Sequence, residues 1–318
     1  MGLVLLLLAG LVCAWVLGIV LTLGMLIRPP RRTYATAVAR GRPGDPGERS
    51  PALAFESFTF SSRGRRLCAW DIRCRNPGGP VVILSHGWGD SRIGAIARLD
   101  PLLPHASRII AWDLPGHGDS PGCCRLGVHE PLDLITLIEI IRPSDTPSTS
   151  VDIVLWGWSL GAGVSIVAAA ARAEGILGVI AESPYRDVKT PARNVLRIYR
   201  LPHFGLLGPA LALVGGFLGA GARWRRAIPP ADVPFDRVSH AAYVRCPVLV
   251  LHGERDEISP LDDGRQIAES CRGQLVSISG GRHNTLWTDP QTRQSCAISV
   301  EEFMRTLAGT IDRHGRGG

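Results

Sequence analysis

One serine of this chain stands where nucleophilic chemistry needs it. The segment Gly157-Trp158-Ser159-Leu160-Gly161 follows an apolar run and precedes a run of small residues, 162–171. This order predicts a strand, a tight turn and a helix, with Ser159 at the turn. Only glycine fits two residues from a serine in so sharp a turn, and the helix N-terminus offers unpartnered N–H groups to a developing oxyanion. The pattern predicts a nucleophile for acyl transfer.

The segments on either side predict the sheet that would hold this turn. Two alternating segments, 53–60 and 67–72, are separated by a turn with glycine and predict an antiparallel hairpin. After them, continuous apolar runs alternate with helical stretches, which is the pattern of a parallel sheet with helices on both faces. The runs are 81–84, 109–112, 151–155, 177–181, 247–251 and 275–278, and helices are expected after residue 90, at about 130–141 and at about 297–307.

Five motifs that follow these strands resemble the α/β-hydrolase superfamily. They are His86-Gly87-Trp88-Gly89-Asp90-Ser91, Asp113-Leu114-Pro115-Gly116-His117-Gly118-Asp119-Ser120, the segment around Ser159, Ala181-Glu182-Ser183-Pro184-Tyr185 and Leu251-His252-Gly253-Glu254-Arg255-Asp256. The fourth motif is similar to a segment, E-S-P-F/Y, of serine-aminopeptidase-like and membrane-anchored hydrolases. The resemblance covers about residues 53–307. It implies an α/β-hydrolase fold with a mostly parallel, eight-stranded sheet and a serine hydrolase that uses no cofactor.

The resemblance also implies the partners of the serine, in the chain order Ser, Asp, His. Asp256 lies in the turn that presents the acid in this superfamily, and Glu254 and Glu257 are the alternatives. His283 stands in a Gly-rich loop after the last predicted strand, where the base is expected. Ser159, Asp256 and His283 are therefore the expected catalytic residues. Three other histidines at strand ends or tight turns are expected to shape loops: His86, His117 and His252.

Two backbone N–H groups would form the oxyanion hole that the resemblance implies. One belongs to Leu160, which follows the serine, and the other to Trp88, which follows His-Gly. The side chains of Trp88, Trp158 and Tyr185 are expected to line the substrate pocket. No metal-binding motif occurs in the sequence, and a serine at the turn argues against the branches of the superfamily that use aspartate there.

A cap-like insertion is expected at about residues 186–240, where the resembled proteins carry the segment that sets substrate choice. Residues 204–222 form an apolar stretch broken by glycine and proline. Two interpretations remain open, a buried cap helix and an interfacial helix that admits acyl chains from a bilayer. Leu213 and Phe217 of this stretch are expected in the substrate pocket.

Residues 1–27 carry no charged side chain and are almost wholly apolar. At 1.5 Å per residue they are long enough to cross a bilayer core of about 30 Å. A cleaved signal peptide has basic residues before a shorter apolar core, and a lipoprotein site at Cys13 lacks the small residues that should precede it. We therefore expect a single uncleaved transmembrane helix. The arginines that follow it predict a cytoplasmic catalytic domain by the positive-inside rule.

Residues 28–52 are rich in proline, glycine and arginine and predict a semi-extended linker before a hydrolase domain at 53–310. Six arginines against two acidic residues give this linker +4 of the formal charge of +7 of the chain. Anionic lipid headgroups explain such a cluster beside a membrane span, and no nucleic-acid-binding motif occurs. The chain has eight cysteines. Without a regular spacing, they fit a reducing compartment rather than a disulfide-stapled domain.

Two enzymatic hypotheses share the same residues. The first is a serine hydrolase that cleaves a carboxylic ester or thioester of a small-molecule or lipid-like acyl substrate through a Ser159 acyl-enzyme. The second is a serine peptidase or amidase, which the serine-aminopeptidase resemblance suggests. In the resembled aminopeptidases, acidic residues of the cap usually recognise the substrate amine. The only acidic residues at 186–235 are Asp187 and Asp232, which favours the ester hypothesis. A non-catalytic binding module is disfavoured because no expected catalytic residue is missing.

Overall fold

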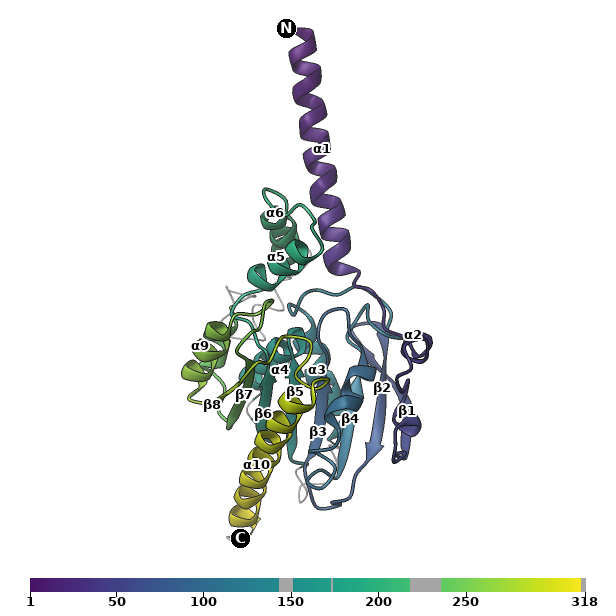
Figure 1. The fold of residues 1–318 in the computed structure, drawn as a ribbon, viewed down its shortest axis with the longest axis vertical. Helices are drawn as coiled ribbons and strands as arrows, with labels where there is room; N and C mark the ends of the chain where they lie inside the picture. The colour runs from purple at the N-terminus through teal and green to yellow at the C-terminus, as the bar shows by residue number, and fades with distance from the viewer. Residues whose placement is uncertain (143–150, 173, 218–235, 316–318) are drawn as a thin grey trace.

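Eight strands form one sheet through the centre of the molecule (Figure 1). The computed structural model describes residues 1–142, 151–172, 174–217 and 236–315. The strands are β1 (Phe55–Ser62), β2 (Arg65–Arg73), β3 (Val81–Ser85), β4 (Arg108–Trp112), β5 (Ile153–Trp158), β6 (Ile176–Glu182), β7 (Val248–Gly253) and β8 (Gln274–Ile278). Their order is β1-β2-β4-β3-β5-β6-β7-β8, and only β2 runs antiparallel to its neighbours. The prediction of a mostly parallel, eight-stranded sheet is confirmed.

A two-residue turn joins the first two strands. Arg63 and Gly64 both have positive φ, 51° and 73°, and Ser62 pairs with Arg65 directly across the turn. Such turns match the twist of the two strands, and glycine adopts the second conformation without strain. The hairpin predicted from the alternating segments is therefore present.

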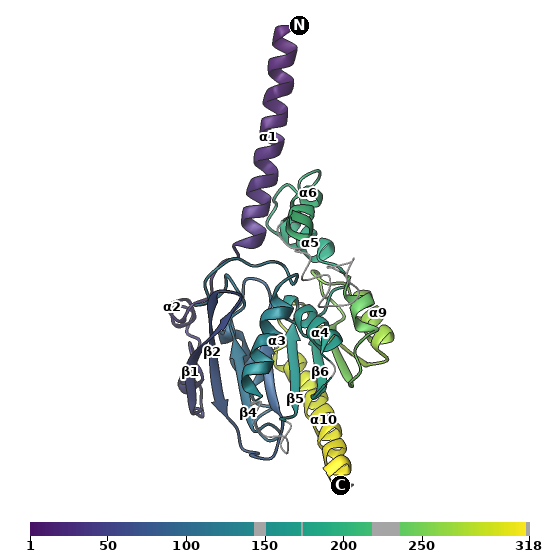
Figure 2. The same ribbon diagram turned by 180° about the vertical axis from the view of Figure 1, so that it is seen from behind.

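Helices cover both faces of the sheet (Figures 1 and 2). Alternate side chains of β3 belong to two separate apolar cores, with Val81 and Ile83 in one and Val82 and Leu84 in the other. Because both faces are buried, a strand of this kind is a continuous apolar run. The first core also receives side chains of α3 (Glu130–Ile141), α4 (Leu160–Ala171) and α9 (Leu261–Cys271), and the second those of η2 (Arg92–Arg98) and α10 (Pro290–Gly315).

The N-terminal helix α1 (Gly2–Ile27) projects away from the sheet in both views (Figures 1 and 2). Within the described ranges it is the one helix long and apolar enough, by length and composition, to cross a membrane. Its first half is exposed, whereas Ile19, Thr22 and Leu26 near its C-terminal end are buried. The end of the apolar helix is thus part of the folded molecule.

The linker after α1 differs from the semi-extended segment that its composition predicts. It contains two short helices, α2 (Tyr34–Val38) and η1 (Pro46–Glu48). Side chains cap both helices: Thr33 and Thr36 exchange hydrogen bonds at α2, and Asp45 accepts the first N–H groups of η1. Ion pairs Arg32–Asp90 (3.1 Å) and Arg49–Asp100 also tie the linker to the domain. Capping and these distant partners explain why the segment folds.

The described part of the expected cap lies between β6 and β7. It consists of α5 (Lys189–Ile198), α6 (Leu207–Ala212) and the π-helical turn η3 (Leu213–Phe217), and α8 (Arg237–Ala241) leads back to β7. In both views α5 and α6 rise beside α1 (Figures 1 and 2). The remainder of the apolar stretch 204–222 lies outside the described residues.

Candidate active site

Ser159 occupies the sharp turn between β5 and α4. Its φ and ψ are 53° and −114°, a conformation that is strained for a residue with a side chain. The Ser159 N–H donates to the carbonyl oxygen of Glu182 at 2.8 Å, which holds the turn against β6. A Cβ on Gly157 would lie 2.0 Å from the Gly161 oxygen, and one on Gly161 would lie 1.9 Å from the Ser85 oxygen. Any side chain at either flanking position would clash with the backbone, so both positions require glycine, as the sequence predicts.

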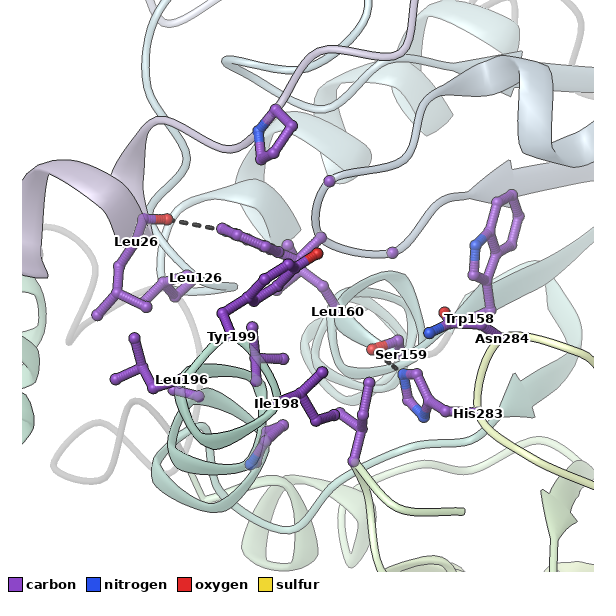
Figure 3. A pocket seen from close by; sticks show the side chains of 18 of the residues that line it. Leu26, Leu126, Trp158, Ser159, Leu160, Leu196, Ile198, Tyr199, His283 and Asn284 are labelled. Atoms are coloured by element: carbon purple, nitrogen blue, oxygen red, sulfur yellow. Dashed lines mark hydrogen bonds between the residues drawn. The ribbon is translucent and has the colours of Figure 1, made fainter. Parts of the chain in front are cut away.

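The structure brings Ser159, His283 and Asp256 together from three separate loops at the carboxyl ends of the strands. Nε2 of His283 lies 2.9 Å from Ser159 Oγ (Figure 3). Nδ1 of the same ring lies 2.7 Å from Asp256 Oδ2. With the proton on Nδ1, the ring donates to the carboxylate and accepts from the serine hydroxyl. These are the contacts that a nucleophile, its base and an orienting acid require.

Asp256 is fixed by hydrogen bonds on both carboxylate oxygens. Oδ1 accepts the N–H groups of Ile258 (2.9 Å) and Ser259 (2.7 Å), while Oδ2 faces His283. Burial alone would raise the pKa of Asp256, but the hydrogen bond and charge of His283 and the charge of His252 hold that pKa below its ordinary value. The group is thus a carboxylate at neutral pH. The alternatives Glu254 and Glu257 are exposed.

Two further histidines shape the loops beside Ser159, as expected. His86 Nδ1 donates to the Gly87 carbonyl at 2.8 Å, and its Nε2 accepts the Leu114 N–H at 2.9 Å. His117 packs edge-on against His86, with ring centroids 4.8 Å apart. Burial lowers the pKa of each ring to about 3. Both rings are therefore neutral at neutral pH and hold the loop that carries Trp88.

A cavity of about 850 Å³ lies over Ser159. Its lining includes Leu160 and the side chains predicted from the sequence, Trp88, Trp158 and Tyr185. Figure 3 shows Leu196 and Ile198 of α5, and Tyr199 just after this helix, on the side of the cavity away from His283. The apolar residues that α5 and its flanks contribute are Val188, Pro191, Ala192, Val195, Leu196, Ile198, Tyr199 and Leu201.

Leu213 does not meet the expectation of a pocket residue. Its side chain is 37 % exposed and is absent from the described cavity lining. Leu211 and Val214 of the same stretch are buried, so this short helix turns Leu213 outward. The side chain of Phe217 lies outside the described residues, and its predicted role stays a prediction.

The wall opposite α5 comes from the N-terminal segment, which the sequence does not associate with the site. Met25 and Leu26 of α1 line the cavity, and Trp88 Nε1 donates to the Leu26 carbonyl at 2.9 Å (Figure 3). Four linker arginines also reach the lining: Arg28, Arg31, Arg32 and Arg40. These contacts could not be predicted from the sequence, because its composition predicts a semi-extended linker and the contacts form only when the linker folds onto the domain.

A buried ion pair behind the serine is a second feature that sequence analysis does not find. Arg98 Nε donates to Glu182 Oε2 at 2.8 Å, and Trp287 Nε1 donates to the same oxygen at 2.9 Å. The Arg98 guanidinium also lies 4.0 Å from the ring centre of Trp158. Glu182 is the first residue of the E-S-P-Y segment, so the sequence motif draws attention to it. Nothing in the sequence identifies its distant partner Arg98.

The described residues contain no group of three or more His, Cys, Asp and Glu side chains that could hold a metal ion. All eight cysteines are unpaired. The Ser159 hydroxyl lies beside the imidazole of His283 and at the N-terminus of α4. A hydroxyl in such a position can attack a carbonyl carbon and form a covalent acyl intermediate.

The parallel sheet and the serine at its strand-to-helix turn define the class of protein. A family model described as the alpha/beta hydrolase family matches residues 81–293, and this chain belongs to that family. The solved structure of the Pyrococcus furiosus esterase Pf2001 shares the fold, with a TM-score of 0.65 and 18 % identity over 88 % of this chain and 98 % of the esterase. The resemblance stated from the motifs is confirmed at the level of the superfamily.

Two curated relatives match most of this chain. The biotin biosynthesis bifunctional protein BioHC of Cellvibrio japonicus is 30 % identical over 74 % of this chain and 49 % of its own length. The lysophosphatidylserine lipase ABHD12 of Danio rerio is 27 % identical over 67 % of this chain and 56 % of its own length. The chain thus spans about half the length of these relatives. Together with the family match, they place it in the alpha/beta hydrolase family.

Proposed function

We propose that this protein is a membrane-anchored serine hydrolase that cleaves carboxylic esters of lipid-like molecules with an apolar acyl chain. The observation that carries the proposal is the pair of hydrogen bonds that link Ser159 to His283 and His283 to Asp256 beneath the cavity. Thioesters present the same acyl carbon to the serine and belong to the same proposal.

In the proposed reaction His283 acts first as a base and then as an acid. Nε2 takes the proton of Ser159 Oγ while the oxygen attacks the ester carbonyl, and the Asp256 carboxylate stabilises the imidazolium. The N–H groups of Trp88 and Leu160 receive the oxyanion. His283 then protonates the leaving alcohol, and Ser159 is left as an ester of the acyl group. A water molecule, deprotonated by His283, hydrolyses this acyl-enzyme and restores the serine.

The shape and charge of the cavity favour an ester of an amphiphile over a peptide. Its α5 wall is apolar, whereas the linker wall presents four arginines. Two carboxylates belong to the described lining, Glu182 and the exposed Glu257. The Glu182 carboxylate is engaged by Arg98 and Trp287, so it is poorly placed to bind a free amine. An apolar chain beside α5 and an anionic headgroup beside the arginines match this arrangement. The relative named a lysophosphatidylserine lipase supports a lipid ester.

Ser159→Ala in the full-length protein tests the assignment. We expect its turnover of p-nitrophenyl butyrate to fall by at least about 10⁴-fold, because the nucleophile is lost. Labelling by a fluorophosphonate should be lost as well. The control is Ser165→Ala, which removes a buried hydroxyl from the same helix and should leave both readouts unchanged. Full turnover by Ser159→Ala would overturn the proposal.

We also infer that α1 is an uncleaved transmembrane segment and that the hydrolase domain lies on the cytoplasmic side. The arginines from 28 to 42 support this orientation, and eight unpaired cysteines suit a reducing compartment. Protease added to sealed inside-out vesicles should digest the domain, and protease added to right-side-out vesicles should not. Protection in the inside-out vesicles would contradict this topology.

A further inference from the structure

The cap is attached to the side of α1, well before the end of that helix. Trp15 Nε1 donates to the carbonyl oxygen of Gly205 at 3.0 Å. Leu206 packs on Gly18, where a Cβ would lie only 3.0 Å from the leucine Cδ2. Both views place α6 beside the C-terminal half of α1 (Figures 1 and 2). A small residue of α1 thus allows close packing of the cap on the proposed transmembrane helix.

The position of these contacts along α1 fixes their depth. The 26 residues of α1 span about 39 Å, which exceeds an apolar bilayer core of about 30 Å by roughly 9 Å. If that excess lies at the C-terminal end, Gly18 is roughly 3 to 5 Å inside the core boundary. If it lies at the N-terminal end, Gly18 is about 14 Å inside. In either placement the contact with Leu206 falls within the leaflet nearest the domain.

The surface of the cap that reaches this level is apolar and lacks acidic groups. Phe204 is 95 % exposed, and the same stretch of chain has further exposed apolar side chains at Ile198, Tyr199, Leu201 and Leu213. Residues 188–231 contain no aspartate or glutamate. The exposed arginines Arg197 and Arg200 are long enough to extend their charged ends to lipid headgroups. An apolar surface flanked by arginines in this way suits the interface of a lipid bilayer.

The same apolar surface continues into the cavity over Ser159. Ile198, Tyr199 and Leu201 line the cavity and are also exposed, so they form part of its rim. Met25 and Leu26 at the end of α1 also line the cavity, and Figure 3 shows Leu26 across a gap from Leu196 of α5. The opening between α5 and α1 therefore faces the level at which a bilayer would begin.

We propose that Leu201–Leu213 is a second membrane-embedded element, packed on α1, and that the cavity opens between α5 and α1 into the near leaflet. The partner of this surface is the bilayer itself. An acyl chain would then move from the leaflet past Ile198 and Tyr199 to Ser159 without leaving an apolar environment. The entry route rests on the proposed hydrolase function, whereas the insertion of the cap rests only on the proposed transmembrane helix α1.

Photocrosslinking tests the insertion directly. A benzoylphenylalanine replaces Phe204 in the full-length protein, which is reconstituted into vesicles of phosphatidylcholine and phosphatidylglycerol and irradiated. We expect adducts with lipid acyl chains, detected by mass spectrometry. The label at Ile298 is the matched control, because this apolar residue is 56 % exposed but lies on α10, which points away from α1 (Figure 1). An absence of lipid adducts at 204, or adducts with protein only, would overturn the proposal.

A substitution tests the entry route. Phe204→Asp should lower turnover of a long-chain ester embedded in vesicles by roughly tenfold, because a carboxylate disfavours insertion of the cap. It should not affect p-nitrophenyl acetate, which reaches the serine from water. Ile298→Asp is the control and should change neither. Equal losses on both substrates would refute lateral entry. If the wild-type protein hydrolyses no ester, the proposed function fails, while the crosslinking result still decides the insertion.

Discussion

The single hydrogen bond between Asp256 and His283 decides how the histidine presents its base to Ser159. Asp256→Asn keeps the size of the side chain but removes the charge that stabilises the imidazolium, and it favours the wrong ring tautomer. We expect kcat for p-nitrophenyl butyrate to fall by about 10⁴-fold with a much smaller change in KM. Steady-state kinetics of the purified full-length protein measure both constants.

Glu254→Gln is the control for this prediction. It removes a carboxylate two residues away, exposed and in the same turn, that the sequence alone leaves open as the acid. Its kcat should stay within about twofold of wild type, as expected for a surface charge away from the reacting groups. If Glu254→Gln lost activity and Asp256→Asn did not, the assignment of the acid would be wrong.

The buried ring of His86 makes the free energy of unfolding depend on pH. In the unfolded chain a histidine titrates near 6.5, whereas burial lowers the pKa of folded His86 to about 3. Between these values the unfolded state binds more protons, so this contribution to stability is complete above about 6.5 and is lost as pH falls toward 3. The slope approaches roughly 1.4 kcal/mol per pH unit for each such group.

His86→Gln removes this titration while keeping polar groups at the site. We expect the variant to be less stable than wild type at pH 7 by about 1–3 kcal/mol, because the bonds to Gly87 and Leu114 are perturbed. The difference should shrink as pH falls from 6.5 to 4.5. Urea unfolding in detergent, followed by tryptophan fluorescence at several pH values, measures it. A difference independent of pH would contradict the assigned cause.

At this scale the sequence predicts the proposed reacting groups better than their surroundings. Ser159 stands in a short local motif, and the resemblance to the α/β hydrolases points to Asp256 and His283 in loops that follow later strands. Arg98 was not predicted because its role comes from Glu182, which lies 84 positions away in the sequence. Leu213 was misplaced because the sequence of a short, glycine-broken helix does not determine which side faces the cavity.

At the scale of elements, the packing of α6 on α1 rests on one glycine. Gly18→Leu adds a large side chain where a Cβ alone would already lie 3.0 Å from Leu206 Cδ2, so α6 must move off α1. We expect a roughly fivefold to tenfold loss of turnover on a vesicle-embedded long-chain ester, because the cap no longer frames the cavity. Turnover of p-nitrophenyl acetate should change less. Parallel assays on both substrates measure the ratio.

Gly10→Leu provides the matched control on the same helix. No atom lies within 4 Å of a Cβ at Gly10, so the substitution adds the same apolar side chain without touching the cap. It should leave both activities at the wild-type level. An equal effect of the two substitutions would show that membrane insertion of α1, rather than its contact with α6, causes the loss.

The central strands, such as β3 and β5, were predictable because burial on both faces makes each of them a continuous apolar run. The hairpin was predictable because Arg63-Gly64 suits a two-residue turn. The linker was not, because its composition resembles that of an extended chain. Its fold depends on caps such as Asp45 and on ion pairs with Asp90 and Asp100, which no local pattern reports. Elements whose structure is set by a local sequence pattern can thus be predicted from the sequence. Elements stabilised by residues far away in the chain cannot.

For the whole molecule, the anchor, linker and domain enclose one cavity, and the linker determines its charge. Arg31 and Arg32 are bonded to the Gly118 carbonyl and to Asp90. In contrast, the guanidinium groups of Arg28 and Arg40 have no hydrogen-bond or ion-pair partner among the described residues, although both reach the cavity lining. These two cations are therefore available to a substrate in the cavity.

Replacement of both Arg28 and Arg40 by glutamine should change substrate preference. If their charges bind an anionic headgroup, kcat/KM for a single-chain ester with a phosphate headgroup falls by about tenfold, and its salt dependence weakens. Hydrolysis of a neutral monoacylglycerol should be nearly unchanged, since the apolar wall and Ser159 are intact. Arg42→Gln, in the same linker but outside the described cavity lining, should alter neither substrate. Equal losses on the charged and neutral esters would assign the two arginines to the fold of the linker rather than to headgroup recognition.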